Sequence, residues 1–350
     1  MQVETVDLGA GVRVSRIAKG NWQLAERHGG AFDRGGAIAD MRAFVDAGIT
    51  LFDCADHYVG VEELIGEFRR RHPEQSRKLR VSTKLVPDQE SLPRLQSADL
   101  ERIVDRSLAR LGQERLDLVQ FHWWDYRVPG WVQALQWMKE MQAAGKIALI
   151  GTTNFDTLRL REIVESGVPV ATNQLQYSLV DGRPERGMTE LCAKHGVQLL
   201  CYGVLAGGFI GKRWLGAPEP REPYANRSLV KYKLIIEDAG GWARFQELLA
   251  ALQKIADRHG VSLSSVATRW LLDRPGAAVA LLGARDASHL AEALEVFRLR
   301  MDDSERETLS AFARAAPGPR GDCYELERVE DGVHSSIMWK NQNTHGAGAR

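Results

Sequence analysis

The chain has 350 residues, long for one ordinary domain but usual for a barrel with insertions. Lys plus Arg and Asp plus Glu both total 46, so a formal net charge of zero gives no electrostatic case for nucleic acid or an anionic membrane as partner. The sequence has no apolar run of membrane-spanning length, no signal-peptide pattern and no C-x-x-C pair among its four cysteines. We therefore expect a reduced, cytoplasmic protein.

Short apolar runs alternate with amphipathic helical patterns, for example over residues 98–112 and 130–144. A helix with one apolar stripe between two short buried strands is typical of a parallel βαβ unit. The chain therefore predicts an α/β fold, a closed (β/α)₈ TIM barrel in one domain over residues 1–350 with its core at about 16–300; a doubly wound open sheet is the alternative. The eight predicted strands are Arg16–Lys19, Thr50–Asp53, Leu79–Lys84, Asp117–His122, Ile147–Gly151, Val170–Asn173, Gln198–Tyr202 and Ala277–Gly283.

Several segments depart from this repeat. Val3–Leu8 and Val12–Val14 predict an N-terminal hairpin that caps the bottom of the barrel. Residues 203–242, after the seventh strand, are too long for a neutral connector and are expected to form a binding loop. Extra helices are predicted over 262–273 and 302–315, followed by an irregular tail over 317–350 that we expect to fold in part over the barrel mouth.

Ionisable residues end three successive predicted strands. Asp53, Lys84 and His122 close the second, third and fourth strands. In such barrels the active site lies at the carboxyl ends of the strands, so these three side chains should meet at one rim. Singly, an Asp there is often a helix cap, a Lys is usually solvated, and a His is more often a core residue. The conjunction on adjacent strands favours a catalytic site.

Tyr58 follows Asp53 closely enough to fold back over the same rim. Free tyrosine titrates near pH ~10, so a tyrosine that exchanges protons near neutrality needs a lowered pKa. A cation about 4 Å away contributes on the order of 4 kcal/mol at an effective dielectric of ~20, or about three pKa units. We therefore expect Lys84 to lower the pKa of Tyr58 and Asp53 to keep Lys84 charged.

These motifs, in their order, resemble the aldo-keto reductase superfamily over residues 3–315. Phe52-Asp53-Cys54-Ala55-Asp56-His57-Tyr58, Val81-Ser82-Thr83-Lys84 and Gln120-Phe121-His122 are similar to its catalytic motifs. Gly151-Thr152-Thr153-Asn154-Phe155, Asn173-Gln174, and Tyr202 with Leu205-Ala206-Gly207-Gly208 resemble its cofactor motifs. The resemblance implies a reductase with Tyr58 as general acid on a carbonyl oxygen and His122 orienting that carbonyl.

The same resemblance implies a nicotinamide cofactor. Thr153, Asn154 and Gln174 would hold its carboxamide and Tyr202 would stack on its ring, while Leu205 and Gly207 would offer backbone N–H groups to the pyrophosphate. The adenosine end would lie at Arg285, His289 and Glu292, although Ala293 stands where many relatives have Asn. Arg285 favours NADP(H) over NAD(H), since a guanidinium pairs well with a 2′-phosphate. Asp286 opposes this unless it serves as a helix N-cap.

For the substrate pocket we expect Trp22 together with Trp123 and Trp124, although one or both of that pair could be ordinary packing residues; Trp339 is a further candidate. We predict no metal site, because the histidines show no metal-ligand spacing. The partner is a small carbonyl or alcohol, with no nucleic acid and no membrane. The substrate, the direction of reaction and the oligomeric state stay open.

Three other interpretations remain. A barrel aldolase could form a Schiff base through Lys84, which leaves Tyr202 and the loop after the seventh strand unused. A regulatory or structural subunit could bind the cofactor with little turnover, although a pure binder has no need of a proton donor. A dehydrogenase that oxidises a sugar would use the same four residues in the opposite direction.

Overall fold

The computed structural model describes residues 2–26, 32–315, 318–338 and 340–341. Eight parallel strands close into a barrel in the order β10-β3-β4-β5-β6-β7-β8-β9, so the (β/α)₈ prediction is confirmed and the open sheet is excluded. The strands are β3 (Ile17–Gly20), β4 (Leu51–Asp53), β5 (Arg80–Leu85), β6 (Leu116–Phe121), β7 (Ile147–Thr153), β8 (Val170–Gln176), β9 (Gln198–Tyr202) and β10 (Ala277–Gly283).

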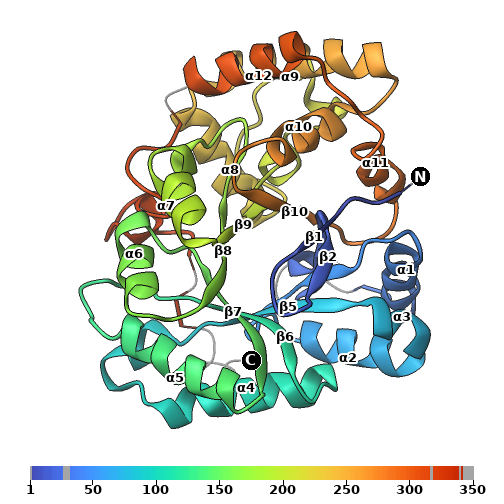
Figure 1. Ribbon diagram of the computed structural model, residues 1–350. Coiled ribbons are helices and arrows are strands. Elements are labelled where there is room, and N and C mark those ends of the chain that lie inside the picture. Colours follow the sequence, from blue (N-terminus) through green and yellow to red (C-terminus); the bar gives the residue numbers. More distant parts are fainter. Residues whose placement is uncertain (1, 27–31, 316–317, 339, 342–350) are drawn as a thin grey trace.

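The helices surround this barrel, and the predicted elements at 262–273 and 302–315 appear as α10 and α12 (Figure 1). The described helices are α1 (Arg34–Asp46), α2 (Val61–Arg71), α3 (Pro73–Lys78), α4 (Ser97–Leu111), α5 (Trp131–Ala143), α6 (Thr157–Glu165), α7 (Met188–His195), α8 (Arg227–Asp238), α9 (Gly241–His259), α10 (Leu263–Leu272), α11 (Leu290–Glu295) and α12 (Asp303–Ala315). Their apolar faces bury a large core between helices and sheet. In α2, Gly66 is required by packing, because a Cβ there would lie 2.0 Å from the carbonyl oxygen of Arg110 in α4.

The predicted hairpin forms from β1 (Thr5–Asp7) and β2 (Arg13–Ser15), paired antiparallel. Its Leu8, Val12 and Val14 pack with the apolar side chains inside the barrel, such as Leu118 and Leu149. The hairpin therefore closes the amino-terminal end of the barrel and leaves the carboxyl ends of the strands for the site.

The segment after β9 is more ordered than the sequence suggested. Residues 203–242 were expected to be a loop, but they contain a 3₁₀ turn, η4 (Ala206–Gly208), and the whole of α8. Asn226 caps α8, since its side chain accepts a hydrogen bond from the N–H of Leu229, and Leu229, Tyr232, Ile235 and Ile236 bury one face. Composition alone hid this helix, because Gly and Pro residues precede it.

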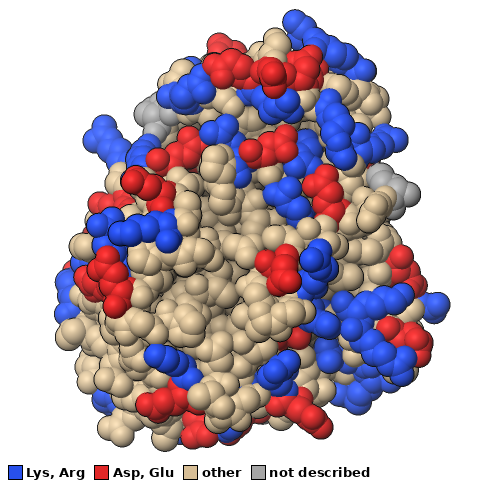
Figure 2. Space-filling model, in the orientation of Figure 1, with Lys and Arg blue, Asp and Glu red and all other residues tan. Residues whose placement is uncertain are grey.

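Charged groups of both signs are interspersed on the face seen in Figure 2, in keeping with the balanced composition. Over the described part of the chain, no helix is both long and apolar enough to span a bilayer.

Candidate active site

Asp53 and Lys84 form a buried ion pair at the carboxyl ends of β4 and β5. The Lys84 Nζ lies 2.6 Å from Asp53 Oδ2 and donates a second hydrogen bond to the carbonyl oxygen of Cys54 at 2.8 Å. Gln174 donates to the other Asp53 oxygen at 2.6 Å. Burial alone would lower the pKa of Lys84, but Asp53 and then Tyr58 outweigh it and raise that pKa above its usual value. Lys84 is therefore a fixed cation.

Tyr58 lies beside this cation, with the Lys84 Nζ 5.1 Å from the centroid of its ring. Trp22 packs against the same phenol, with ring centroids 4.7 Å apart. The expectation that Lys84 brings the pKa of Tyr58 below its usual value is wrong for this structure. Burial is the larger effect and raises that pKa, while the Lys84 charge opposes it. Tyr58 therefore stays a protonated phenol at neutral pH.

His122 follows β6, and its ring is 2% exposed. Its Nδ1 lies 3.0 Å from the carbonyl oxygen of Thr153, so Nδ1 carries the hydrogen of this bond. Burial, followed by the charge of Arg328, lowers the pKa of His122 to about 3, so the ring is neutral. The Nε2 atom is buried and has no hydrogen-bond partner among the described residues. In this tautomer it is a hydrogen-bond acceptor.

The two adjacent tryptophans have different surroundings. Trp124 packs edge-on against His122, with ring centroids 4.3 Å apart, and its indole N–H donates to the carbonyl oxygen of Pro87. Trp123 is 1% exposed, and its indole N–H donates to the carbonyl oxygens of Asp125 and Val128. The prediction that Trp123 lines the pocket is therefore wrong, because its side chain belongs to the core. Trp339 lies outside the described residues.

The four residues predicted for the nicotinamide end come from the neighbouring strands β7, β8 and β9 or directly follow them. Asn154 follows β7, and its side-chain oxygen accepts a 2.7 Å hydrogen bond from the Tyr202 hydroxyl. Its backbone N–H donates to the carbonyl oxygen of Gln174. Thr153 is 2% exposed, and its carbonyl oxygen is bound by the His122 ring. A carboxamide needs both donors and acceptors, and Asn154 and Gln174 offer both, so these residues fit that group after exchanging their present partners.

Backbone strain collects at this end of the barrel. Asn154, Ala206 and Tyr324 have φ angles of 61°, 45° and 58°, and they account for three of the five non-glycine residues with positive φ in the described segments. Such conformations cost on the order of 1 kcal/mol or more each and persist where the surroundings fix them, often at functional sites. The strain therefore points to the same region as the ionisable groups.

The predicted pyrophosphate turn at Leu205 and Gly207 lies under α8. Gly207 has a φ of 65°, and a Cβ on it would lie 2.5 Å from the ring of Tyr232 and 3.2 Å from the carbonyl oxygen of Ser228. Glycine is thus required at 207 both by conformation and by the close approach of α8. The structure brings this turn next to Tyr202.

The predicted adenosine end is open to solvent. Arg285, Asp286 and His289 are exposed, and the Glu292 carboxylate lies 3.6 Å from the His289 ring in an exposed pair. The helix-cap interpretation of Asp286 is wrong, because the residue before α11 is His289. Asp286 instead accepts hydrogen bonds from the backbone N–H and the hydroxyl of Ser288.

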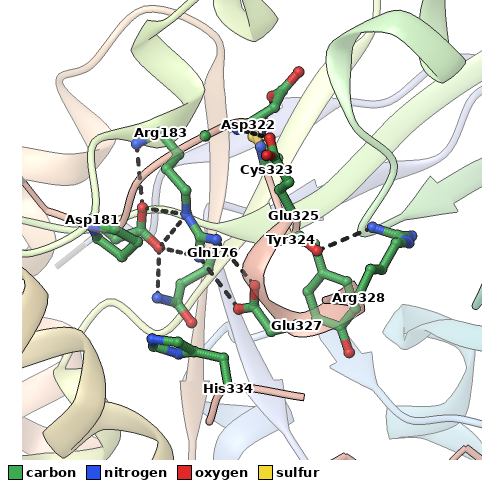
Figure 3. A network of polar contacts seen from close by, with 12 residues as sticks. Gln176, Asp181, Arg183, Asp322, Cys323, Tyr324, Glu325, Glu327, Arg328 and His334 are labelled. Atoms are coloured by element: carbon green, nitrogen blue, oxygen red, sulfur yellow. Dashed lines mark hydrogen bonds and ion pairs between the residues drawn. The ribbon is translucent and has the colours of Figure 1, made fainter. Parts of the chain in front are cut away.

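The C-terminal tail lies over this end of the barrel, as the sequence predicted. Tyr324 contacts His122 edge-on with ring centroids 5.6 Å apart, and the guanidinium of Arg328 donates to the carbonyl oxygens of Trp123 and Asn154. The tail and the barrel are joined by a buried ionic network (Figure 3). In it, Arg183 donates hydrogen bonds to Asp181, two residues away in the chain, and to Glu327 of the tail. Tyr324 and Arg328 are thereby fixed beside the catalytic candidates.

The family is settled by comparison with known proteins. The model of the Aldo/keto reductase family matches residues 16–314. The chain belongs to that family. Its members are oxidoreductases that use nicotinamide cofactors, so both the fold and the class of chemistry expected from the sequence are confirmed.

Three similar proteins illustrate the range of this aldo/keto reductase's relatives. Aldo-keto reductase YhdN of Bacillus subtilis is 29% identical over 311 residues, which span 86% of this chain and 91% of that protein. Flagellar radial spoke protein 5 of Chlamydomonas reinhardtii is 29% identical over 258 residues, 63% of this chain and 49% of that protein. The structure of a glycerol dehydrogenase from Gluconobacter oxydans matches with a TM-score of 0.74 and 25% identity, covering 91% of this chain and 97% of that one.

Sequence reasoning missed three charged residues at the site of this aldo/keto reductase. Lys231 of α8 lies over the Tyr202 ring, and Glu327 and Arg328 lie in the tail. No strand end marks them, because they come from segments outside the βα repeat. The only signal was the unusual length of those segments.

Proposed function

We propose that this aldo/keto reductase transfers hydride between a nicotinamide dinucleotide and a carbonyl or alcohol substrate such as an aldehyde, ketone or sugar, with Tyr58 as the general acid. One observation carries the proposal. The Lys84 ammonium, fixed by Asp53 at 2.6 Å, lies 5.1 Å from the Tyr58 ring at the rim that also holds the unpartnered His122 Nε2. A phenol beside a permanent cation is suited to donate a proton to a developing alkoxide.

The bound cofactor would supply or accept the hydride. Tyr58 would give its phenolic proton to the carbonyl oxygen during reduction, and the Lys84 charge would stabilise the phenolate that remains. Asn154 and Gln174 would orient the carboxamide, and Tyr202 would support the ring. The packing of Trp22 on Tyr58, and of Trp124 and Tyr324 on His122, would limit access of water to the reacting atoms.

The role of His122 depends on its tautomer. With Nδ1–H committed to the carbonyl oxygen of Thr153, the neutral ring accepts at Nε2 and therefore suits the hydroxyl of an alcohol. To donate to a carbonyl oxygen, the ring would need a second proton. This supports a site that binds the alcohol form well, and it keeps the oxidative direction open.

Two alternatives separate clearly. A Schiff-base aldolase needs a neutral lysine, whereas Asp53 holds Lys84 protonated. The similarity to a flagellar radial spoke protein, together with α8 and the tail over the site, supports a cofactor-binding subunit with little turnover as the second candidate. A panel of aldehydes, ketones, sugars and polyols, assayed with reduced and oxidised cofactors by nicotinamide absorbance, decides between the proposed enzyme and such a subunit. Cofactor binding without turnover of any compound would favour the subunit.

For the cofactor we propose a preference for NADP(H) over NAD(H). Arg285 is an exposed basic residue of the proposed adenosine end, and hydrogen bonds between Asp286 and Ser288 draw that carboxylate toward its own turn. Arg285→Ala should weaken NADPH binding roughly tenfold and leave NADH binding almost unchanged, because only the first carries a 2′-phosphate. Dissociation constants for both cofactors at one ionic strength would measure this. An unaltered ratio in the variant would refute the assignment.

A further inference from the structure

Lys231 is a mostly buried cation that the proposed mechanism does not use. It belongs to α8, whose next residue, Tyr232, packs on Gly207 of the turn after β9. The side chain is 15% exposed. Lys231 therefore lies close to two parts of the proposed site. Its helix, α8, covers the turn proposed for the pyrophosphate, and its ammonium lies over Tyr202, which is proposed to support the nicotinamide ring.

Three tyrosine rings surround the ammonium. The Nζ lies 4.9 Å from the centroid of Tyr202, 5.7 Å from that of Tyr232 and 5.8 Å from that of Tyr324. Tyr324 in turn contacts His122. The charge is thus held between the cofactor side and the substrate side of the site. Aromatic faces stabilise a cation without satisfying its N–H donors.

The hydrogen-bonding capacity of Lys231 is unmet within the described segments. An ammonium has three donors, yet no hydrogen bond from the Lys231 ammonium to another described residue is found, and its charged neighbour Glu327 is 3.9 Å away. Both Glu327 oxygens are already bonded to Arg183, at 3.0 and 3.3 Å (Figure 3). Burial of most of the side chain lowers the pKa of Lys231, with Glu327 opposing that effect, while the 15% exposure leaves the side chain accessible to a ligand. An anionic ligand would accept hydrogen bonds from the donors of the ammonium that no described group accepts.

We propose that Lys231 is an anion-binding residue of this site, whose ligand is a phosphate or carboxylate group carried by the cofactor or by the substrate. The inference rests on the proposed function. It adds a specific electrostatic contact that comes from α8 rather than from a strand end.

The competing explanation is that Lys231 only neutralises the network formed by Asp181, Arg183 and Glu327. Its charge does help to lower the pKa of Glu327, after the larger effect of Arg183. However, a structural counter-charge would be expected at hydrogen-bonding distance, as Arg183 is. The two explanations differ in what removal of the charge changes, either ligand affinity or the stability of the fold.

The test uses Lys231→Met, which keeps the length of the side chain, and Lys231→Arg, which keeps the charge. Lys254→Met, on an exposed residue of α9, is the matched control for net charge. In the first arm, dissociation constants for NADPH are measured by fluorescence without substrate at several salt concentrations. In the second arm, the complex with oxidised cofactor is titrated with 4-carboxybenzaldehyde and with benzaldehyde. Thermal unfolding of each variant is recorded in parallel.

If the ligand is a phosphate of the cofactor, Lys231→Met should weaken NADPH binding roughly 10- to 100-fold and make that binding less dependent on salt. If the ligand is a carboxylate of the substrate, Lys231→Met should keep the affinity for NADPH. The ratio of affinities for 4-carboxybenzaldehyde and benzaldehyde should then fall by a similar factor. Lys231→Arg should restore most of either loss. Equal constants for wild type and Lys231→Met in both arms, with or without a lower melting temperature, would overturn the proposal. Failure of the proposed function is distinguishable, because the wild type itself would then turn over no carbonyl or alcohol.

Discussion

Tyr58→Phe is expected to keep the dissociation constants for the cofactor within about twofold while kcat falls by ~10²–10⁴-fold. The substitution removes the hydroxyl but keeps the ring that packs against Trp22 at 4.7 Å, so the local structure should persist. Because burial raises the pKa of Tyr58, the phenol is protonated throughout the neutral range, and the rate of reduction should show no loss from this group until the pH approaches or exceeds ~10.

Lys84→Met is the partner experiment. It should lower kcat by a comparable factor, because the phenolate left after proton transfer would lose the charge that stabilises it. It also leaves Asp53 buried without its cation, so a lower melting temperature is expected for this variant and not for Tyr58→Phe. Near wild-type turnover by Tyr58→Phe would show that the proton comes from another group, and the proposed mechanism would fail.

The sequence predicted those parts of the site that the barrel repeat itself positions. Asp53, Lys84 and His122 end consecutive strands, and parallel strands in register bring such residues to one rim. The spacing of motifs is a local property of the chain, and so both the strands and these side chains could be placed without coordinates. The prediction that the tail lies over the mouth of the barrel was correct for a simpler reason. A long segment after the last helix must lie somewhere on the barrel.

Competing interactions in space decided the features that the sequence misjudged. The pKa of Tyr58 was expected to follow the Lys84 charge, but burial is the larger effect and cannot be read from spacing. Trp123 and Trp124 are identical side chains in adjacent positions, and only packing sends the first into the core. The network of Arg183 with Glu327 joins residues 144 positions apart, so no local pattern could have indicated it.

That network is the basis of the second large effect. Arg183, Asp181 and Glu327 are each 1% exposed or less at their side chains. Removing one member of a buried ion pair typically costs 3–5 kcal/mol, because the remaining charges stay buried without compensation. Arg183→Met should therefore lower the free energy of unfolding by about that amount. Arg127→Met is the matched control, since Arg127 also pairs with the tail, through Glu330, but is 68% exposed, so its loss should leave the free energy of unfolding almost unchanged.

The pH dependence of this loss identifies its cause. Burial alone would raise the pKa of Glu327, but Arg183 and then Lys231 outweigh it and lower that pKa to about 2, from an ordinary value of 4.5. A carboxyl whose pKa is lower in the folded state stabilises the fold above the unfolded value, and this contribution is lost as the pH falls through about 2. Its size is on the order of 3 kcal/mol.

In Arg183→Met, burial acts on Glu327 with Lys231 and a backbone hydrogen bond of Glu327 to oppose it, so the pKa of Glu327 should rise and its stabilising contribution should shrink or change sign. The difference in free energy of unfolding between wild type and Arg183→Met should consequently grow as the pH rises from about 3 to about 7, whereas the difference for Arg127→Met should stay small. Urea unfolding at several pH values measures both. A large difference that is the same at every pH would mean that Arg183 holds the tail by packing of its side chain, and that the charges of the network contribute little.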